Sequence, residues 1–339
     1  MASIDPALSE RTEGAVRAPE AGWTRLGIWP LGLLAAAGWV GVAALIELWP
    51  EIIPQPYGSE LALIALVIAA GLVTVAATGR LLGAISGTVR YYGPWFIAGA
   101  AIVAIWEILT AKTGLLPVPF FSSPQSILEV FFDDWNRLGI SIWYSVLLLT
   151  KGYVLGALAG FLTGITIGWS QTASYWVHPV LRLIGPLPAT AWLPLAFFIF
   201  PTSGTASVFL IALATAFPVT ILTWSGIASV NRDYYDIART LGANPWFLIL
   251  KVAVPAALPH VFVGLFMGLG TSFAVLVVAE MLGVKAGLGW YLQWAQGWAA
   301  YSNMYAALLA MALMCSGLIT VLFRLRDWTL SWQKGLVRW

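Results

Sequence analysis

Long apolar segments alternate with short polar segments along almost the whole chain. Eight of them have the roughly 20 mostly apolar residues that a helix needs to cross a bilayer. They lie at about 26–48, 61–84, 93–112, 141–169, 180–200, 204–228, 249–281 and 303–325. The pattern predicts an all-α polytopic membrane protein with about eight transmembrane helices.

The fifth apolar segment is the least regular, because Pro186, Pro188 and Pro194 interrupt it. A proline inside a helix removes a backbone donor and breaks the ladder of hydrogen bonds. At membrane depth the freed backbone groups must be satisfied by protein or by water in a cavity. We therefore expect this span to line a pathway rather than face lipid, with simple kinks as the alternative.

The composition supports a membrane protein and gives little sign of chemistry. Charged residues make up 9% of the chain, whereas a soluble domain carries roughly 25%. The net charge of +2 suggests no nucleic-acid partner. The single cysteine, Cys315, and the two distant histidines, His178 and His260, predict no metal site and no cofactor.

Basic residues gather in alternate loops, which predicts the orientation of the chain in the membrane. With eight spans, the basic loops all fall on one side, and both termini lie in the cytoplasm. These loops contain Arg11, Arg17, Arg25, Arg80, Arg90, Arg232, Arg239, Arg324, Arg326, Lys334 and Arg338.

The connection that follows the sixth segment has the most informative local pattern. Asn231 can cap a short helix, and Tyr234, Ile237, Ala238 and Leu241 fall on one face of it. Gly242 then stands where a left-handed residue ends a helix. Asn244 and Pro245 restart one, as cap and first-turn residue. A short helix with an apolar face and a sharp glycine turn is suited to docking onto another protein, and an ordinary linker helix is the alternative.

This connection resembles the EAA loop of bacterial ABC-importer permeases. The family pattern is Glu-Ala-Ala, three residues, Gly, nine residues, then Ile-x-Leu-Pro. Asp for Glu preserves the charge, and Ile for Ala enlarges the docking face. The positions that correspond to the pattern are Asp236, Ile237, Ala238, Gly242, Val252, Val254 and Pro255.

Three further stretches resemble the nitrate/sulfonate/taurine/bicarbonate-type permeases. They begin at Leu116, His178 and Val277, and the first and last continue into Ser123-Pro-Gln-Ser-Ile-Leu and Gly287-Leu-Gly. The resemblance covers roughly residues 93–335. It implies a permease domain over 91–339. Two regions lie outside it: a polar stretch over 1–22, which its composition predicts to be a cytosolic tail, and an N-terminal extension over 23–90 with two extra transmembrane helices. The permease domain has a coupling loop at about 231–255 and a core of about six helices like the type I ABC-importer permease fold.

The resemblance also implies partners and a location. A second permease copy, two copies of an ABC ATPase subunit and an extracytoplasmic solute-binding protein would complete a transporter in the bacterial plasma membrane, in contact with membrane lipid. The sequence contains no Gly-x-x-x-x-Gly-Lys-Ser/Thr phosphate loop. The chain is thus expected to be a non-catalytic subunit that relies on a separate ATPase. The residues implied in ATPase coupling are Tyr234, Tyr235, Asp236, Ile237, Ala238, Arg239, Leu241, Gly242 and Pro255.

Two charges lie well inside predicted spans, Lys151 in the fourth and Glu280 in the seventh. An intramembrane charge is costly and suggests function. We consider both, with Pro186, Pro188 and Pro194, as pathway or gating candidates, and we expect each charge to lie near the other or near other polar groups. A structural ion pair and a snorkelling side chain are the alternatives.

Glycines recur every four residues in the fourth segment, at Gly156, Gly160, Gly164 and Gly168. They give the helix one smooth face that allows close approach of another helix. The partner helix can belong to the same subunit or to a second copy.

An ion-coupled secondary transporter and a membrane enzyme are the alternative functions. An ion-coupled secondary transporter needs ionisable residues inside several spans and often an internal repeat. The sequence places only Lys151 and Glu280 well inside spans and has no obvious repeat. A membrane enzyme needs a cluster of titratable or nucleophilic residues, and the sequence contains none that is visible.

Overall fold

A computed structural model describes residues 29–78 and 83–333, and the described residues form helices and no strand. The predicted polar tail, 1–22, lies outside the described residues. Seven helices in the described part are long and apolar enough to cross a membrane, and a bent helix pair makes an eighth span if it counts as one. The prediction of an all-α polytopic membrane protein with about eight spans is confirmed.

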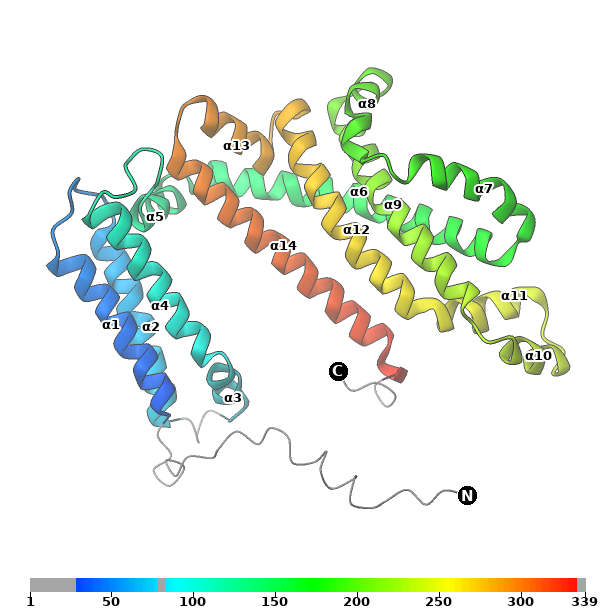
Figure 1. Ribbon diagram of the computed structural model, residues 1–339, viewed down its shortest axis with the longest axis horizontal. Coiled ribbons are helices and arrows are strands. Elements are labelled where there is room, and N and C mark those ends of the chain that lie inside the picture. The colour runs from blue at the N-terminus through cyan, green and yellow to red at the C-terminus, as the bar shows by residue number, and fades with distance from the viewer. Residues whose placement is uncertain (1–28, 79–82, 334–339) are drawn as a thin grey trace, which may run out of the picture. The chain divides into compact units, whose positions relative to one another are not determined.

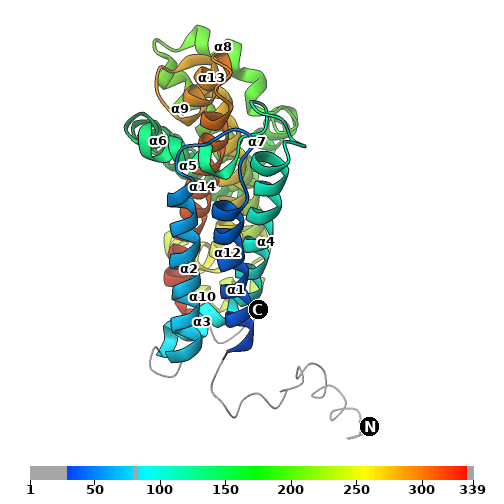
Figure 2. The same ribbon diagram turned by 90° about the vertical axis from the view of Figure 1, so that its left-hand side faces the viewer.

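The chain divides into two compact units, Met1–Glu129 and Val130–Trp339. In the first unit, α1 (Pro30–Leu48) packs against α2 (Gly58–Thr78) and α4 (Gly93–Glu107). The short α3 (Gly83–Tyr91) precedes α4, and a π-helix, η3 (Ile108–Lys112), extends α4 at its other end. Figures 1 and 2 show α1, α2 and α4 running side by side in the blue to cyan part of the chain.

Small side chains bring the helices of the first unit close together. The buried residues of α1 and α2 are mostly alanines, which also pack around Trp29 and Leu72. Small residues allow helix backbones to approach closely in membranes. The facing alanines are Ala35, Ala36, Ala43, Ala62, Ala65, Ala69 and Ala76.

The second unit is built around three long helices that pack on one another, α6 (Trp135–Trp169), α9 (Ser203–Ala228) and α12 (Val254–Gly283). The last long helix, α14 (Tyr301–Thr329), contacts α6 and α12. The short α13 (Leu288–Gly297) packs against α6, α12 and α14. Upstream of these elements, α5 (Pro124–Asp133) is capped by Ser123, whose hydroxyl oxygen accepts a hydrogen bond from the N–H of Ser126 at 3.3 Å.

The predicted glycine face of α6 packs on α9 within the same chain. A Cβ atom added at Gly156 would lie 2.8 Å from the Cα atom of Ala212, and one added at Gly160 would lie 3.0 Å from the Cβ atom of Val219. The two backbones are therefore in direct contact. This face of α6 is occupied by α9 and is not free for a second copy.

The fifth predicted span is broken, as its prolines indicated. It consists of α7 (Gln171–Ile184), a 3₁₀-helix η4 (Ala189–Trp192) and α8 (Leu193–Ile199), and the two helical parts are bent by 86°. Pro186 and Pro188 lie in the bend. Pro194 is in the first turn of α8, where a missing N–H costs nothing, so it begins a helix instead of interrupting one.

Candidate functional site

The predicted docking helix is present as α10 (Arg232–Thr240). It follows α9 directly, and the Asn231 side chain caps it by accepting a hydrogen bond from the N–H of Asp233 at 3.0 Å. Asp233 lies in the first turn and Arg239 in the last, an arrangement that favours the helix dipole. The local sequence thus forms a short helix at the end of a span.

Gly242 ends α10 in the left-handed conformation that the sequence predicted, with φ of +82°. The N–H of Ala243 donates to the carbonyl of Ala238 at 3.0 Å, and the N–H of Gly242 donates to that of Arg239 at 2.9 Å. This pair of bonds is a Schellman motif, which satisfies the last carbonyls of the helix. Gly242 therefore fixes the direction in which the chain leaves α10.

The chain then restarts as a helix at the predicted cap. Asn244 accepts a hydrogen bond from the N–H of Phe247 at 2.8 Å, at the start of α11 (Pro245–Phe247). A π-helix, η5 (Leu248–Ala253), continues directly into α12, and Pro255 lies in the first turn of α12. Residues 231–255, which we call the coupling segment after their predicted role, are thus continuous with two spans, α9 before them and α12 after them.

The two faces of α10 have different environments. Tyr235 faces inward, with its ring 5.9 Å from that of Trp169, and packs beside Ile227. Burial raises the pKa of Tyr235 above that of a free tyrosine. Tyr234 and Ile237 are both 59% exposed.

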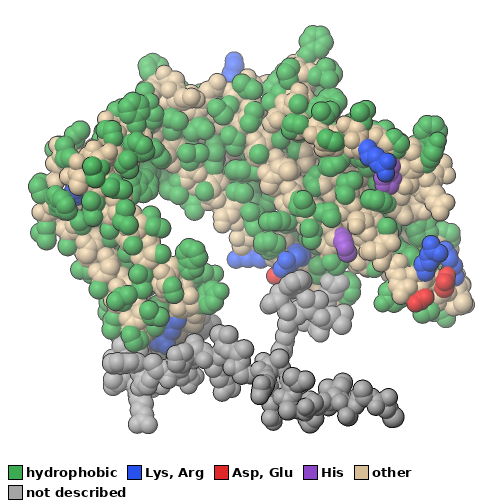
Figure 3. Space-filling model, in the orientation of Figure 1, with side chains coloured by type: hydrophobic (Ala, Val, Ile, Leu, Met, Phe, Trp, Pro, Cys, Tyr) green, Lys and Arg blue, Asp and Glu red, His purple; other side chains and the backbone are tan. Residues whose placement is uncertain are grey.

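The outward face of the segment is apolar with a charged border. Leu241 is 83% exposed, and the exposed Trp246 and Phe247 extend the apolar surface beyond the glycine turn. Asp236 and Arg239 form an exposed ion pair at 3.2 Å, and red and blue side chains meet over α10 in Figure 3. Exposed apolar side chains gathered on a short helix are typical of a surface that another protein covers.

Glu280 lies at a buried junction of α6, α12 and α13 and is fully buried. Its carboxylate accepts hydrogen bonds from the Ser145 hydroxyl at 2.7 and 2.9 Å and from the N–H of Gly289 at 2.8 Å. The Ser145 oxygen in turn accepts from the N–H of Leu288 at 2.8 Å. The carboxylate and the hydroxyl together cap the start of α13, so Glu280 holds α13 against α6 and α12.

Lys151 differs from the expectation. Its side chain is exposed on α6 and makes no hydrogen bond or ion pair with any residue in the described ranges. The carboxylate of Glu280 is occupied by Ser145 and Gly289 instead. The expectation of a polar partner is confirmed for Glu280 and wrong for Lys151 within this chain. The reason is that serine and backbone donors, which cost less to bury than an ammonium group, already satisfy the acid.

A second polar group holds the other side of α13. The Tyr291 hydroxyl donates to Asp134 at 2.8 Å and accepts from the Asn303 amide at 2.6 Å. Burial raises the pKa of Tyr291, so its hydroxyl stays protonated as a donor. The Arg137 guanidinium lies 4.4 Å from the ring centre of Trp294. Polar contacts from α6, α12 and α14 thus fix this short helix in place.

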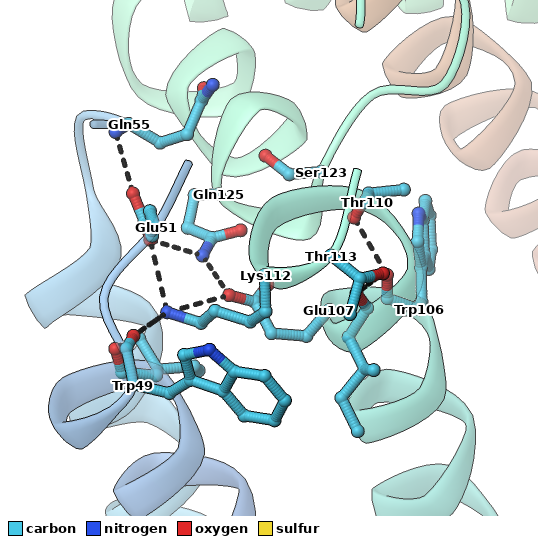
Figure 4. A network of polar contacts seen from close by, with 12 residues as sticks. Trp49, Glu51, Gln55, Trp106, Glu107, Thr110, Lys112, Thr113, Ser123 and Gln125 are labelled. Carbon is cyan, nitrogen blue, oxygen red and sulfur yellow. Dashed lines mark hydrogen bonds and ion pairs between the residues drawn. The ribbon is translucent and has the colours of Figure 1, made fainter. Parts of the chain in front are cut away.

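The first unit contains a buried ionic cluster (Figure 4). Lys112 donates to the carbonyls of Ile46 and Trp49 at 3.0 and 2.7 Å, which are orphan acceptors at the end of α1. Its ammonium lies 3.7 Å from Glu51 and 3.5 Å from Glu107. The lysine therefore ties the end of α1 to the end of α4.

Gln125 joins the two acids of this cluster. Its amide nitrogen donates to Glu51 at 3.0 Å and to Glu107 at 2.7 Å. Next to it, the Ser126 hydroxyl donates to the side-chain oxygen of Gln55 at 2.6 Å, while the Gln55 N–H donates to Glu51 at 2.8 Å. The start of α5 is thereby bonded to the loop between α1 and α2.

Of the residues in the polar groups around Glu280, Tyr291 and Lys112, the sequence pointed only to Glu280. One signal was available, because Glu107 and Lys112 are opposite charges five residues apart at the end of an apolar segment. Ser145, Tyr291 and Gln125 gave no local signal. Each has at least one partner more than 60 positions away along the chain: Glu280 for Ser145, Asp134 for Tyr291 and Glu51 for Gln125.

We predict that Glu280→Ala lowers the free energy of unfolding of the purified chain. The change leaves the Ser145 hydroxyl and the Gly289 N–H without their acceptor, at about 1–3 kcal/mol for each buried group. Glu280→Gln keeps one carbonyl acceptor of the same shape and is expected to lose less. Thermal unfolding of both variants, monitored by size-exclusion chromatography of heated samples, gives their melting temperatures. The control is Glu60→Ala, an exposed acid; equal melting temperatures for Glu280→Ala and the wild type would contradict the capping role.

The described residues thus form a membrane protein whose spanning helices are interrupted by a capped helix with an exposed apolar face. Residues 152–331, more than half of the chain, match the family of the binding-protein-dependent transport system inner membrane component. The chain belongs to this family and is a permease component of an ABC importer, a multi-pass protein of an inner-membrane transport system.

Several known proteins are similar to this chain. The nitrate import permease protein NrtB of Synechococcus elongatus is 30% identical over 218 residues, which cover 62% of this chain and 76% of that protein. A Bacillus subtilis protein named for aliphatic sulfonates transport, SsuC, is 30% identical over 221 residues, 63% of this chain and 78% of its own length. A solved structure of the MetNI methionine ABC transporter in inward-facing form matches with a TM-score of 0.49 at 14% identity, over 58% of this chain and 98% of that one.

Proposed function

We propose that the chain forms the translocation pathway for a small anion, which an extracytoplasmic binding protein delivers and a separate ATPase drives. The anion is nitrate, a sulfonate, taurine or bicarbonate. The relatives named for nitrate and aliphatic sulfonates support this class. The chain itself contributes no catalysis in this proposal.

One observation carries the proposal, the exposed apolar face of α10. Tyr234, Ile237 and Leu241 project from a rigidly capped helix whose ends continue into α9 and α12. A force applied to α10 is therefore transmitted directly to two spans. We propose that two ATPase subunits grip this helix in two copies of the permease, and that ATP binding moves the spans through it.

The remaining predicted residues have supporting roles in this proposal. Pro186, Pro188 and Pro194 border the bend between α7 and α8, where backbone freed from a helix is tolerated beside a pathway. Lys151 is a cation in a span with no polar partner among the described residues, which suits a place facing the pathway or a second copy. Glu280 positions α13 and acts on the pathway only through that helix.

Ion-coupled secondary transport is the alternative. It would draw on acids inside the spans, and Glu107 and Glu280 are the two that are fully buried in the described helices. Both are already bonded to fixed partners in their own unit. Both carboxylate oxygens of Glu280 accept hydrogen bonds, so this acid is not poised to take up a coupling ion, which favours the ATP-driven mechanism.

The proposal is tested by reconstituting the chain in liposomes with its ATPase and binding protein. We expect uptake of one of the four anions that requires ATP, the ATPase and the loaded binding protein together. The matched control omits only the ATPase. Uptake in that control, driven by an imposed proton or sodium gradient, would establish the secondary transporter instead.

We further propose that both termini lie in the cytoplasm, because an even number of spans and the distribution of arginine and lysine agree. A reporter enzyme that works only in the cytoplasm is expected to be active when it is fused after Trp339. A second reporter, placed in the loop between α1 and α2, should give the opposite result. A periplasmic reading after Trp339 would mean that the number of spans is odd.

A further inference from the structure

An open groove of about 850 Å³ lies at the end of the second unit that carries α10. It is lined by the last turn of α6, by α7 and by Trp224 of α9. Its volume falls in the range of roughly 300–1,000 Å³ that is usual for small-molecule sites. The groove therefore has room for a ligand much larger than a single nitrate ion.

Four large aromatic side chains contribute to the wall of the groove. Trp169, Tyr175, Trp176 and Trp224 all line it. Tyr175 and Trp176 meet edge to face at 5.3 Å and are 73% and 71% exposed. Aromatic side chains supply a large apolar contact area, and the indole N–H of each tryptophan adds a hydrogen-bond donor.

The charged side chain that lines the groove is an arginine. Arg182 is exposed in the last turn of α7 and makes no ion pair with any residue in the described ranges. Among the described residues that line the groove, none is Asp or Glu. The positive charge of Arg182 is consequently free to meet an anion from outside the chain.

His178 is held in a fixed orientation beside this arginine. Its Nδ1 lies 2.8 Å from the Ser174 hydroxyl, and its ring is edge-on to Trp224 with centres 4.4 Å apart. Its Nε2 is buried and has no hydrogen-bond partner in the described structure. Figure 3 shows blue and purple side chains together over α7, and no red one among them.

We propose that this groove binds an anion that carries an apolar body, with the charged group at Arg182 and the apolar part against the tryptophan rings. The inference deepens the proposed function, on which it rests for its physiological meaning. It selects alkyl or aryl sulfonates over nitrate and bicarbonate, which have no apolar part. The same chemistry is offered by the headgroup and chains of an anionic phospholipid.

The first experiment titrates the purified full-length chain, in a neutral detergent, with 1-hexanesulfonate and with nitrate by isothermal calorimetry. We expect hexanesulfonate to bind at least about tenfold more tightly than nitrate, because only it uses the aromatic wall. Arg182→Gln should weaken hexanesulfonate binding about tenfold, since a charge-assisted contact is lost. The matched control, Arg324→Gln, changes an exposed arginine outside the groove and should bind as the wild type does.

A second pair of variants tests the aromatic wall. Trp176→Ala should weaken hexanesulfonate binding and leave the weak nitrate binding unchanged. Trp328→Ala removes a comparably exposed tryptophan outside the groove and should have no effect. Equal binding of nitrate and hexanesulfonate, or binding that is indifferent to Arg182, would overturn the inference.

Lipid competition identifies the source of the anion. The titration is repeated in nanodiscs of phosphatidylcholine with and without phosphatidylglycerol. Loss of hexanesulfonate binding when phosphatidylglycerol is added assigns the groove to a lipid, and unchanged binding assigns it to the transported anion. Copurification of the ATPase with the chain is scored separately. If the chain binds hexanesulfonate but does not copurify with the ATPase, the inference holds and the proposed function is refuted. If the chain copurifies with the ATPase but its binding does not depend on Arg182, the proposed function holds and the inference is refuted.

Discussion

Replacing Gly242 with Asp is expected to abolish transport while the chain remains in the membrane at a near-normal amount. Gly242 has φ of +82°, a conformation that costs a residue with a side chain about 1–2 kcal/mol. A Cβ atom at this position would meet nothing within 4 Å among the described residues. The new side chain therefore projects into open space beside the exposed face of α10, where the ATPase is proposed to dock.

The decisive measurement is ATP hydrolysis by the assembled complex. Gly242→Asp should remove the stimulation of ATP hydrolysis by loaded binding protein, because the chain no longer leaves α10 in its normal direction and the new side chain intrudes on the proposed contact with the ATPase. The control is Gly87→Asp in α3, which also has open space around it and has no positive φ. Normal transport by Gly242→Asp, or transport without any ATPase, would refute the docking proposal.

The spans could be predicted from the sequence because hydropathy and length act locally. The predicted segments at 204–228 and 303–325 fall on α9 and α14 to within a few residues. The fourth began too late, at 141, because α6 extends back to Trp135 through polar residues beyond the apolar run. The fifth missed the first turns of α7, whose amphipathic sequence does not satisfy an apolar-run criterion.

The coupling segment was also predictable, since caps and glycine turns are encoded by neighbours. Asn231, Gly242 and Asn244 all have the local roles that their positions indicated. Its proposed role in ATPase coupling stays a prediction. The domain limits at residues 22 and 90 stay predictions as well. The first marks the end of the polar N-terminal composition, and the second marks where the resemblance to permeases begins.

The long-range polar contacts could not be predicted. Glu280 was recognised as an intramembrane acid, but its partner Ser145 lies 135 positions away. Nothing in a single sequence distinguishes Ser145 from the other serines of the spans. Lys112 poses the same problem, because its partners are backbone carbonyls at Ile46 and Trp49, which every residue possesses.

The contact between α6 and α9 leads to the prediction with the largest effect on folding. A side chain at Gly156 would run into the carbonyl oxygen of Ala212 and lie 2.8 Å from its Cα atom. These are backbone atoms at the centre of the second unit, so they can move only if α9 moves as a whole. Gly156→Val is therefore expected to cost about 3 kcal/mol or more.

Gly139 provides a matched control in the same helix, because a Cβ atom there would meet nothing within 4 Å in the part of the chain that the structure describes. Gly139→Val should give a normal yield of monodisperse protein and a melting temperature near that of the wild type. Gly156→Val should give little monodisperse protein on size-exclusion chromatography, and what remains should melt well below the wild type. Similar melting temperatures for the two variants would mean that α6 and α9 are not packed backbone to backbone. The face of α6 that carries Gly156 would then again be available to a second copy of the permease.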